Sequence, residues 1–159
     1  MMIVKVRRTG GNIVATENDK TFIAKPEGWD QKGIINSLKR AFTLKYEVFD
    51  ETNLLVSQVE YNSLENQIII RKKSGNVAID LPTFCVNSAV YHIREKMTGL
   101  SVTPVQTTRD QSSDAVMSIE ATKSLTEYSM KFTSYDENMH PVLKEFAIGF
   151  MIRWMSYLY

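Results

Sequence analysis

A run of apolar residues near the C-terminus constrains the fold of this chain more than any other feature. Every residue from 146 to 152 is apolar or glycine, and mostly apolar residues follow Arg153. We expect a helix from Val142 to near Leu158, because Pro141 is tolerated at a first helical position, where its missing N–H would lack a partner anyway. A helix that is apolar on nearly all sides must be buried in protein or lie in lipid.

The length of this segment favours burial in protein. Residues 146–159 would form about 21 Å of helix, against a hydrocarbon core of about 30 Å. Arg153 lies within it, and a charged residue near mid-bilayer costs about 3 kcal/mol. We therefore expect no transmembrane span, with Arg153 at a helix end or paired. The expected core residues of the helix are Phe146, Ile148, Gly149, Phe150, Ile152 and Trp154.

The rest of the chain alternates apolar and polar residues with a period of two, which is typical of half-buried strands. Strands are expected at residues 2–7, 12–16, 21–25, 44–49, 54–61, 67–73, 77–81, 84–86, 89–94, 100–106, 117–122 and 128–133. Pro104 predicts an edge strand or a bulge, and the polar segment 107–114 predicts a mobile loop. Between Asp30 and Phe42 the apolar spacing becomes helical, which predicts one amphipathic helix near residues 30–42.

These patterns predict a mainly β (α+β) fold. Repeated hairpins indicate an antiparallel β-barrel or a strongly curved meander wrapped around the C-terminal helix, because a meander hides its edges best by closing on itself. The 159 residues contain no repeat, low-complexity tract or linker, so we expect a single domain over 1–159.

Composition excludes several classes of protein. The single Cys85 excludes a disulfide within the chain and a zinc site with several cysteines. Early charges at Lys5, Arg7 and Arg8 argue against a signal peptide, so a soluble, cytoplasmic protein is expected, with a membrane-peripheral position as a variant. The formal charge is 19 − 18 = +1, which demands neither nucleic acid nor a membrane.

That total hides an asymmetry. Residues 1–45 hold nine Lys/Arg and four Asp/Glu (+5), and residues 46–159 hold ten and fourteen (−4). The basic N-terminal part would steer an anionic partner toward it, unless folding intermixes the two segments.

Three segments resemble, in order, parts of the tubby-like superfamily, which includes tubby C-terminal domains, LURP-one-related proteins and phospholipid scramblases. Residues 45–50 followed by 56–60 resemble its tyrosine-bearing hairpin, and 70–77 resemble the next hairpin, with a glycine turn. Residues 144–152, with the step from Ile148 to Gly149, resemble the scramblase terminal helix. The resemblance covers about a third of the chain and implies strands closed around a C-terminal helix.

The sequence also departs from that family. It is short for a full twelve-stranded barrel, and the helix near residues 30–42 is an addition or a divergence. The acidic calcium-binding segment and the cysteine-rich palmitoylation tract of scramblases have no counterpart, so calcium-triggered scrambling is not expected.

No catalytic or metal constellation is recognisable. Cys85 lies in an apolar strand, where a small core residue is expected. His92 lies on a strand and His140 precedes Pro141, too far apart in the sequence to suggest a triad or a metal set. We therefore expect a protein that is not an enzyme and needs no cofactor.

Basic residues form the one functional cluster that the sequence suggests. Lys5 and Arg7 share a strand face, and the other candidates close the internal helix or approach a hairpin turn. Tubby domains bind phosphoinositide headgroups through basic strand residues, so the resemblance implies an anionic lipid ligand. The candidates are Lys5, Arg7, Lys39, Arg40, Arg71, Lys72 and Lys73. Ordinary solvated surface charge is the alternative.

Two other functions are considered. A protein-interaction or regulatory factor, of the kind that viruses or mobile elements encode, would use exposed aromatic residues around 126–133 or 154–159. Nucleic-acid binding through the basic N-terminal part is the third, and the near-neutral charge and lack of an RNP-like aromatic motif argue against it.

Overall fold

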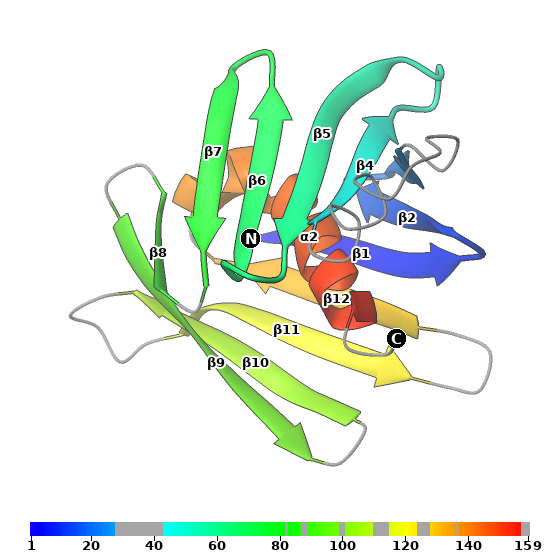
Figure 1. Ribbon diagram of the computed structural model, residues 1–159. Coiled ribbons are helices and arrows are strands. Elements are labelled where there is room, and N and C mark those ends of the chain that lie inside the picture. Colours follow the sequence, from blue (N-terminus) through cyan, green and yellow to red (C-terminus); the bar gives the residue numbers. More distant parts are fainter. Residues whose placement is uncertain are drawn as a thin grey trace.

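The computed structural model describes residues 1–27, 43–81, 83–86, 89–98, 101–109, 115–123, 128–135 and 137–156. Figure 1 shows one strongly curved antiparallel sheet with a C-terminal helix, α2, against its inner side. The amphipathic helix expected near residues 30–42 lies outside the described residues, as do Lys39 and Arg40.

Twelve strands form the sheet in these ranges. They are β1 (Met2–Thr9), β2 (Asn12–Glu17), β3 (Lys20–Pro26), β4 (Thr43–Phe49), β5 (Leu55–Asn62), β6 (Gln67–Lys72), β7 (Gly75–Asp80), β8 (Thr83–Val86), β9 (Ala89–Thr98), β10 (Ser101–Arg109), β11 (Ala115–Lys123) and β12 (Tyr128–Ser134). Their order is β7-β6-β5-β4-β3-β2-β1-β12-β11-β10-β9-β8. The first strand therefore pairs with the last, and the sheet is open between β7 and β8.

The helical part at the C-terminus begins with a 3-10 helix, η1 (Glu137–Val142), and continues as α2 (Leu143–Ser156). Pro141 lies inside η1 rather than at the expected start of the α-helix. The helix α2 contacts β1, β2, β5, β6 and β12. The core residues expected on it, Phe146, Ile148, Gly149, Phe150, Ile152 and Trp154, are all buried. The predicted mainly β sheet around a C-terminal helix is confirmed, in the form of an open curved meander.

Alternation along the strands explains this packing. On β1, Val4 and Val6 are buried against α2 while Lys5 and Arg7 are exposed on the other face. On β12, the Phe132 ring packs edge-on at 5.9 Å from that of Phe150. Each apolar side chain buried in this way contributes about 1.5–3 kcal/mol. The inner faces of the strands therefore supply the core that the apolar helix requires.

A glycine allows α2 to approach β6 closely. A Cβ atom at Gly149 would lie 2.5 Å from Cγ2 of Ile68, which is far inside van der Waals contact. Ile68 is fully buried, so its side chain has little room to give way. Gly149 is therefore a packing requirement of the helix and sheet.

Arg153 is buried and paired. Its Nε donates to Oδ1 of Asn66 at 3.0 Å, and the hydroxyl of Tyr61 donates to the same oxygen at 2.9 Å. The side-chain Nδ2 of Asn66 also donates to the Leu81 carbonyl oxygen at 3.4 Å. Asn66 has a φ of 51°, a left-handed conformation that asparagine tolerates better than most residues. This polar cluster satisfies Arg153 inside the curved sheet.

Some details of the strands differ from expectation. The β6–β7 turn lies at residues 73–74 rather than 74–76, and Gly75, with a φ of 135°, begins β7. Residues 107–109 belong to β10 rather than to a loop. That strand pairs with both β9 and β11, so it is not an edge strand, and its register shifts between Thr103 and Gln106, around Pro104.

The chain accommodates twelve strands, although they form an open sheet and not a full barrel. Turns of only two residues join β1 to β2, β2 to β3 and β6 to β7, which leaves more of the chain for the strands. None of the helices within the described ranges combines the length and the apolar character that a membrane crossing needs.

Candidate functional site

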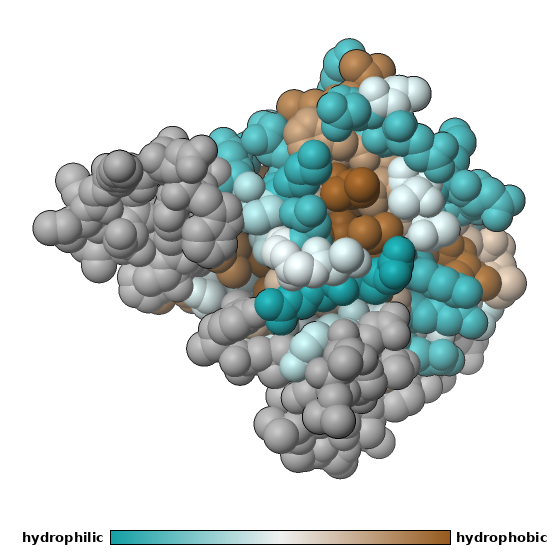
Figure 2. Space-filling model, turned by 90° about the vertical axis from the view of Figure 1, so that its right-hand side faces the viewer, coloured by the Kyte–Doolittle hydropathy of each residue, from teal (hydrophilic) through white to brown (hydrophobic). Residues whose placement is uncertain are grey.

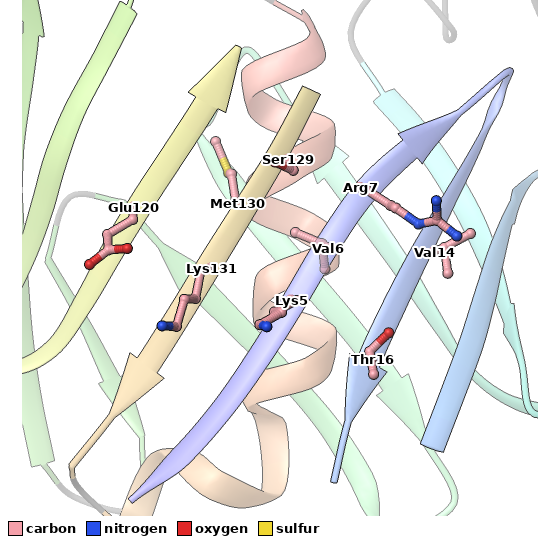
Figure 3. A pocket seen from close by; sticks show the side chains of 9 residues that line it. All are labelled: Lys5, Val6, Arg7, Val14, Thr16, Glu120, Ser129, Met130 and Lys131. Carbon is pink, nitrogen blue, oxygen red and sulfur yellow. The ribbon is translucent and has the colours of Figure 1, made fainter. Parts of the chain in front are cut away.

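A groove with a volume of about 390 Å³ lies on the outer face of the sheet, where β1, β2, β11 and β12 run side by side (Figure 3). It is lined by Lys5, Val6, Arg7, Val14, Thr16, Glu120, Ser129, Met130 and Lys131. Figure 3 views this face with α2 behind the sheet. The groove is therefore on the side of the strands that does not pack against the core.

The register of the strands brings the polar side chains of the groove together. Lys5 lies opposite Lys131 on β12 and opposite Thr16 on β2. Lys131 in turn lies opposite Glu120 on β11. These four residues form one row across four strands. Directly opposite residues on one face have their Cβ atoms about 5 Å apart, so their head groups can reach a common ligand.

Arg7 and Ser129 form the adjacent row. They lie opposite each other, two residues along from Lys5 and Lys131. The groove thus contains three cationic side chains, Lys5, Arg7 and Lys131, and one carboxylate, that of Glu120. Because Lys5 and Lys131 are like charges directly opposite each other, their pairing is unfavourable. A bound anion would relieve that repulsion.

Only part of the predicted basic set lies in this groove. Lys5 and Arg7 are there, joined by Lys131, which sequence reasoning did not select. The signal for Lys131 was present in the alternation of residues 128–133, which places it on the outer face of its strand. The pairing of the first strand with the last, which brings it next to Lys5, has no local signature in the sequence.

Arg71, Lys72 and Lys73 do not join the groove, because β6 is five strands away from β1. Nη1 of Arg71 donates to Oε2 of Glu60 at 2.7 Å. Lys73 is exposed in the β6–β7 turn. Lys72 donates through Nζ to the carbonyl oxygen of Pro141 at 2.8 Å. Two of these three cations are thus held by groups of the protein itself.

Lys72 also lies close to a buried carboxylate, that of Glu145. Oε1 of Glu145 lies 3.2 Å from Nζ of Lys72 and 3.4 Å from Nζ of Lys144. The Glu145 side chain is only 1% exposed, and neither contact is aligned as a hydrogen bond. Glu145 lies in the first turn of α2, where the helix dipole favours a negative charge. The contacts of Lys72 with Pro141 and Glu145 therefore connect the start of α2 to β6.

Other predicted features are distributed as follows. Cys85 lies in β8 and His92 in β9, with side chains outside the described part. Among the described residues no group of three His, Cys, Asp or Glu side chains could hold a metal ion. Trp154, proposed as an exposed contact aromatic, is 4% exposed and packs edge-on against Tyr128 at 5.5 Å. The aromatic contact surface is therefore not formed at Trp154, and residues 157–159 lie outside the described ranges.

Comparison with known proteins gives no family assignment: no family model, no curated protein and no solved structure matches this chain. The basic groove on β1 and β12 is therefore the feature from which a function can be argued.

Proposed function

We propose that this protein is a non-enzymatic binding domain whose outer groove holds the phosphate group of an anionic lipid headgroup. One observation carries the proposal: Lys5, Arg7 and Lys131, from the first and last strands of the sheet, line the same groove. Because phosphate oxygens carry charge that these cations can neutralise, the groove suits such a ligand.

Each polar side chain of the groove has a role toward a phosphorylated headgroup. The guanidinium of Arg7 can donate two parallel hydrogen bonds to phosphate oxygens, whereas Lys5 and Lys131 act as point charges. The hydroxyls of Thr16 and Ser129 can donate further hydrogen bonds. The carboxylate of Glu120 can accept a hydrogen bond from a hydroxyl of a polyol headgroup. Such a mixture suits a phosphorylated polyol better than a bare phosphate ion.

Membership of the tubby-like superfamily is part of this proposal, together with a cytoplasmic position at the periphery of a membrane. Support comes from a meander of twelve strands packed on a C-terminal apolar helix. The resemblance implies strands around such a helix, although closed into a barrel, whereas this sheet is open between β7 and β8. The proposed ligand contacts lie on strand residues, as they do in tubby domains.

Vesicle flotation tests the proposal. Phosphatidylcholine vesicles would be compared with vesicles that also contain a phosphatidylinositol phosphate, and with vesicles of equal charge that contain phosphatidylserine. The groove variant replaces Lys5, Arg7 and Lys131 with glutamine. A control variant of equal charge replaces Lys20, Lys45 and Lys73, which are exposed elsewhere.

We expect the wild type and the control variant to float with phosphatidylinositol phosphate vesicles, and the groove variant to stay behind. Equal flotation of the two triple variants would contradict the proposal. Equal binding of wild type to both anionic lipids would show recognition of charge alone. Calorimetric titration with soluble inositol phosphates then distinguishes a headgroup on a membrane from a free phosphorylated polyol.

A further inference from the structure

A row of apolar side chains crosses the outer face of the sheet next to the groove. Val14 lies opposite Ile23, and Ile23 lies opposite Phe49. The register shifts after Val48, so that Leu55 lies opposite Phe49. Ile23 is 37% and Leu55 is 47% exposed. Figure 2 faces the side of the β1–β2 and β4–β5 hairpins, and shows hydrophobic side chains exposed between hydrophilic ones.

A parallel row beside this strip carries opposite charges at its two ends. It begins at Lys5 on β1 and runs through Thr16 and Thr21. It ends at Glu51, which follows β4 and whose Oε1 accepts a hydrogen bond from the Thr21 amide at 2.8 Å. Both Lys5 and Glu51 are exposed. The strip is therefore bordered by a cation on the β1 side and an anion on the β4 side.

These positions are complementary to themselves under a two-fold rotation. Neighbouring strands lie about 4.8 Å apart, so β1 and β4 each lie about 7 Å from a line drawn between β2 and β3. Let a two-fold axis run along that line, parallel to the strands, so that the outer faces of two copies meet. The rotation then places Lys5 of one copy against Glu51 of the other.

Arg7 lies opposite Val14 in the same row as the strip, and Ser129 lies opposite Arg7. The same rotation therefore places Val14 against Ile23, Phe49 against Arg7 and Leu55 against Ser129. An isologous dimer interface requires a patch that matches its own copy in this way.

We propose that a second copy of this chain docks on the strip formed by Val14, Ile23, Phe49 and Leu55, with Lys5 of each copy paired with Glu51 of the other. A second copy fits this surface better than a bilayer, because the charges around the strip are mixed in sign. Lys25 lies opposite Glu47 with its Nζ 5.3 Å from the centre of the Phe49 ring, and Glu51 borders the other side. The strip spans only four strands, so the dimer is weak and its population rises with protein concentration.

This inference does not rest on the proposed function, although the dimer contact covers part of the groove: Lys5, Arg7, Val14 and Ser129 belong to both. A second copy neutralises Lys5 with its Glu51 and covers Arg7 with its Phe49, so that two of the three groove cations are no longer open to an anion. Dimerisation and anion binding therefore compete, and a soluble inositol phosphate that binds the groove shifts the dimer toward monomer.

Sedimentation velocity over a concentration series reaching the millimolar range tests the association. We expect the wild type to sediment faster as concentration rises, and Ile23→Ser to weaken association by at least about tenfold. Leu64→Ser is the matched control, because Leu64 is 72% exposed in the β5–β6 turn, away from the strip. Leu55→Ser replaces Ile23→Ser if thermal unfolding shows that Ile23→Ser does not fold.

Charge reversal gives the sharper test. Lys5→Glu and Glu51→Lys should each sediment as monomers when alone, because like charges then meet at both contacts of the dimer. An equimolar mixture of the two should associate, since both contacts in the heterodimer join opposite charges. A wild type that stays monomeric at every concentration would overturn the inference, as would a mixture that associates no better than its components. Loss of headgroup binding by Lys5→Glu alone concerns only the proposed function.

Discussion

Lys5 and Lys72 show how differently the two faces of one sheet use the same side chain. Lys5 is exposed on the outer face, with Lys131 opposite it and a groove beside it. Lys72 reaches the junction of η1 and α2, where its Nζ donates to the carbonyl oxygen of Pro141 and approaches the buried carboxylate of Glu145. A charge held by its own protein stabilises the fold, whereas a charge with a like charge opposite is available to a ligand.

The largest expected effect concerns the buried carboxylate that Lys72 approaches. Glu145→Gln removes the carboxylate between Lys72 and Lys144 while keeping its size. Removing one partner of a buried ion pair costs about 3–5 kcal/mol, and we expect a loss of about 3 kcal/mol because both lysines keep some contact with water. Denaturant unfolding measures it.

The matched control is Glu120→Gln, which removes the exposed carboxylate opposite Lys131 in the groove. Surface substitutions of this kind stay within about 0.5 kcal/mol. Equal losses for the two glutamate variants would contradict the distinction between the faces.

The next effect concerns the inner face alone. Gly149→Ala adds a methyl group 2.5 Å from Cγ2 of Ile68, and overpacking of this kind costs about 1–3 kcal/mol. Alanine regains up to about 1 kcal/mol of helix propensity, so the net loss is smaller than the clash alone.

A double-mutant cycle isolates this contact. In an Ile68→Ala background the added methyl has room, so Gly149→Ala should become neutral or stabilising. Urea unfolding of the four proteins gives the coupling. An unchanged cost in the Ile68→Ala background would show that the helix does not approach β6 as described.

A smaller change in stability, of opposite sign, is expected at Lys5. Lys5→Gln removes the repulsion from Lys131 and leaves Lys131 opposite Glu120. We expect the free energy of unfolding to rise by about 0.2–1 kcal/mol, more at low salt, while headgroup affinity falls. Lys72→Gln should instead lose stability and keep its affinity. A change of stability in the same direction for Lys5→Gln and Lys72→Gln would contradict the different roles assigned to the two lysines.

The smallest effect lies in the turn before β5. The Thr52 hydroxyl donates to Oδ1 of Asp50 at 2.7 Å, and the amides of Leu54 and Thr52 donate to the same oxygen. These bonds lower the pKa of Asp50 below its usual 3.8, the hydroxyl having the largest influence. Because the folded pKa is lower than the unfolded one, this stabilisation is present above pH 3.8 and lost as pH falls through the lowered pKa.

Thr52→Val tests the cause of that shift, because it removes the hydroxyl and keeps the shape of the side chain. The pKa of Asp50, followed by NMR, should move back toward 3.8. A pKa that does not move would assign the shift to the backbone amides alone.

Much of the fold followed from local patterns. Alternation over residues 2–7 and 128–133 placed strands there because one face of each is buried. The apolar run from 146 to 152 predicted a core helix, because a helix that is apolar on nearly all sides must be buried. The bulge around Pro104 was one of two expectations, and the pairing of β10 on both sides could not be read from one strand.

The candidate site was less accessible from the sequence. Lys5 and Arg7 were identifiable by their spacing on one strand. Lys131 needed the pairing of β1 with β12, a contact between residues more than 120 positions apart. The sequence also grouped Arg71 with Lys72 as neighbours, although Glu60 holds one and Glu145 the other. Long-range register, which local pattern does not encode, decided both outcomes.

One measurement tests the groove most directly: an amide NMR titration of the whole chain with a soluble inositol phosphate. We expect the amide chemical shifts of Lys5, Arg7, Thr16, Ser129 and Lys131 to change, while those of Lys72 and Lys73 stay the same. Shift changes centred on the β6–β7 turn, or no shift changes at any concentration of the ligand, would contradict it.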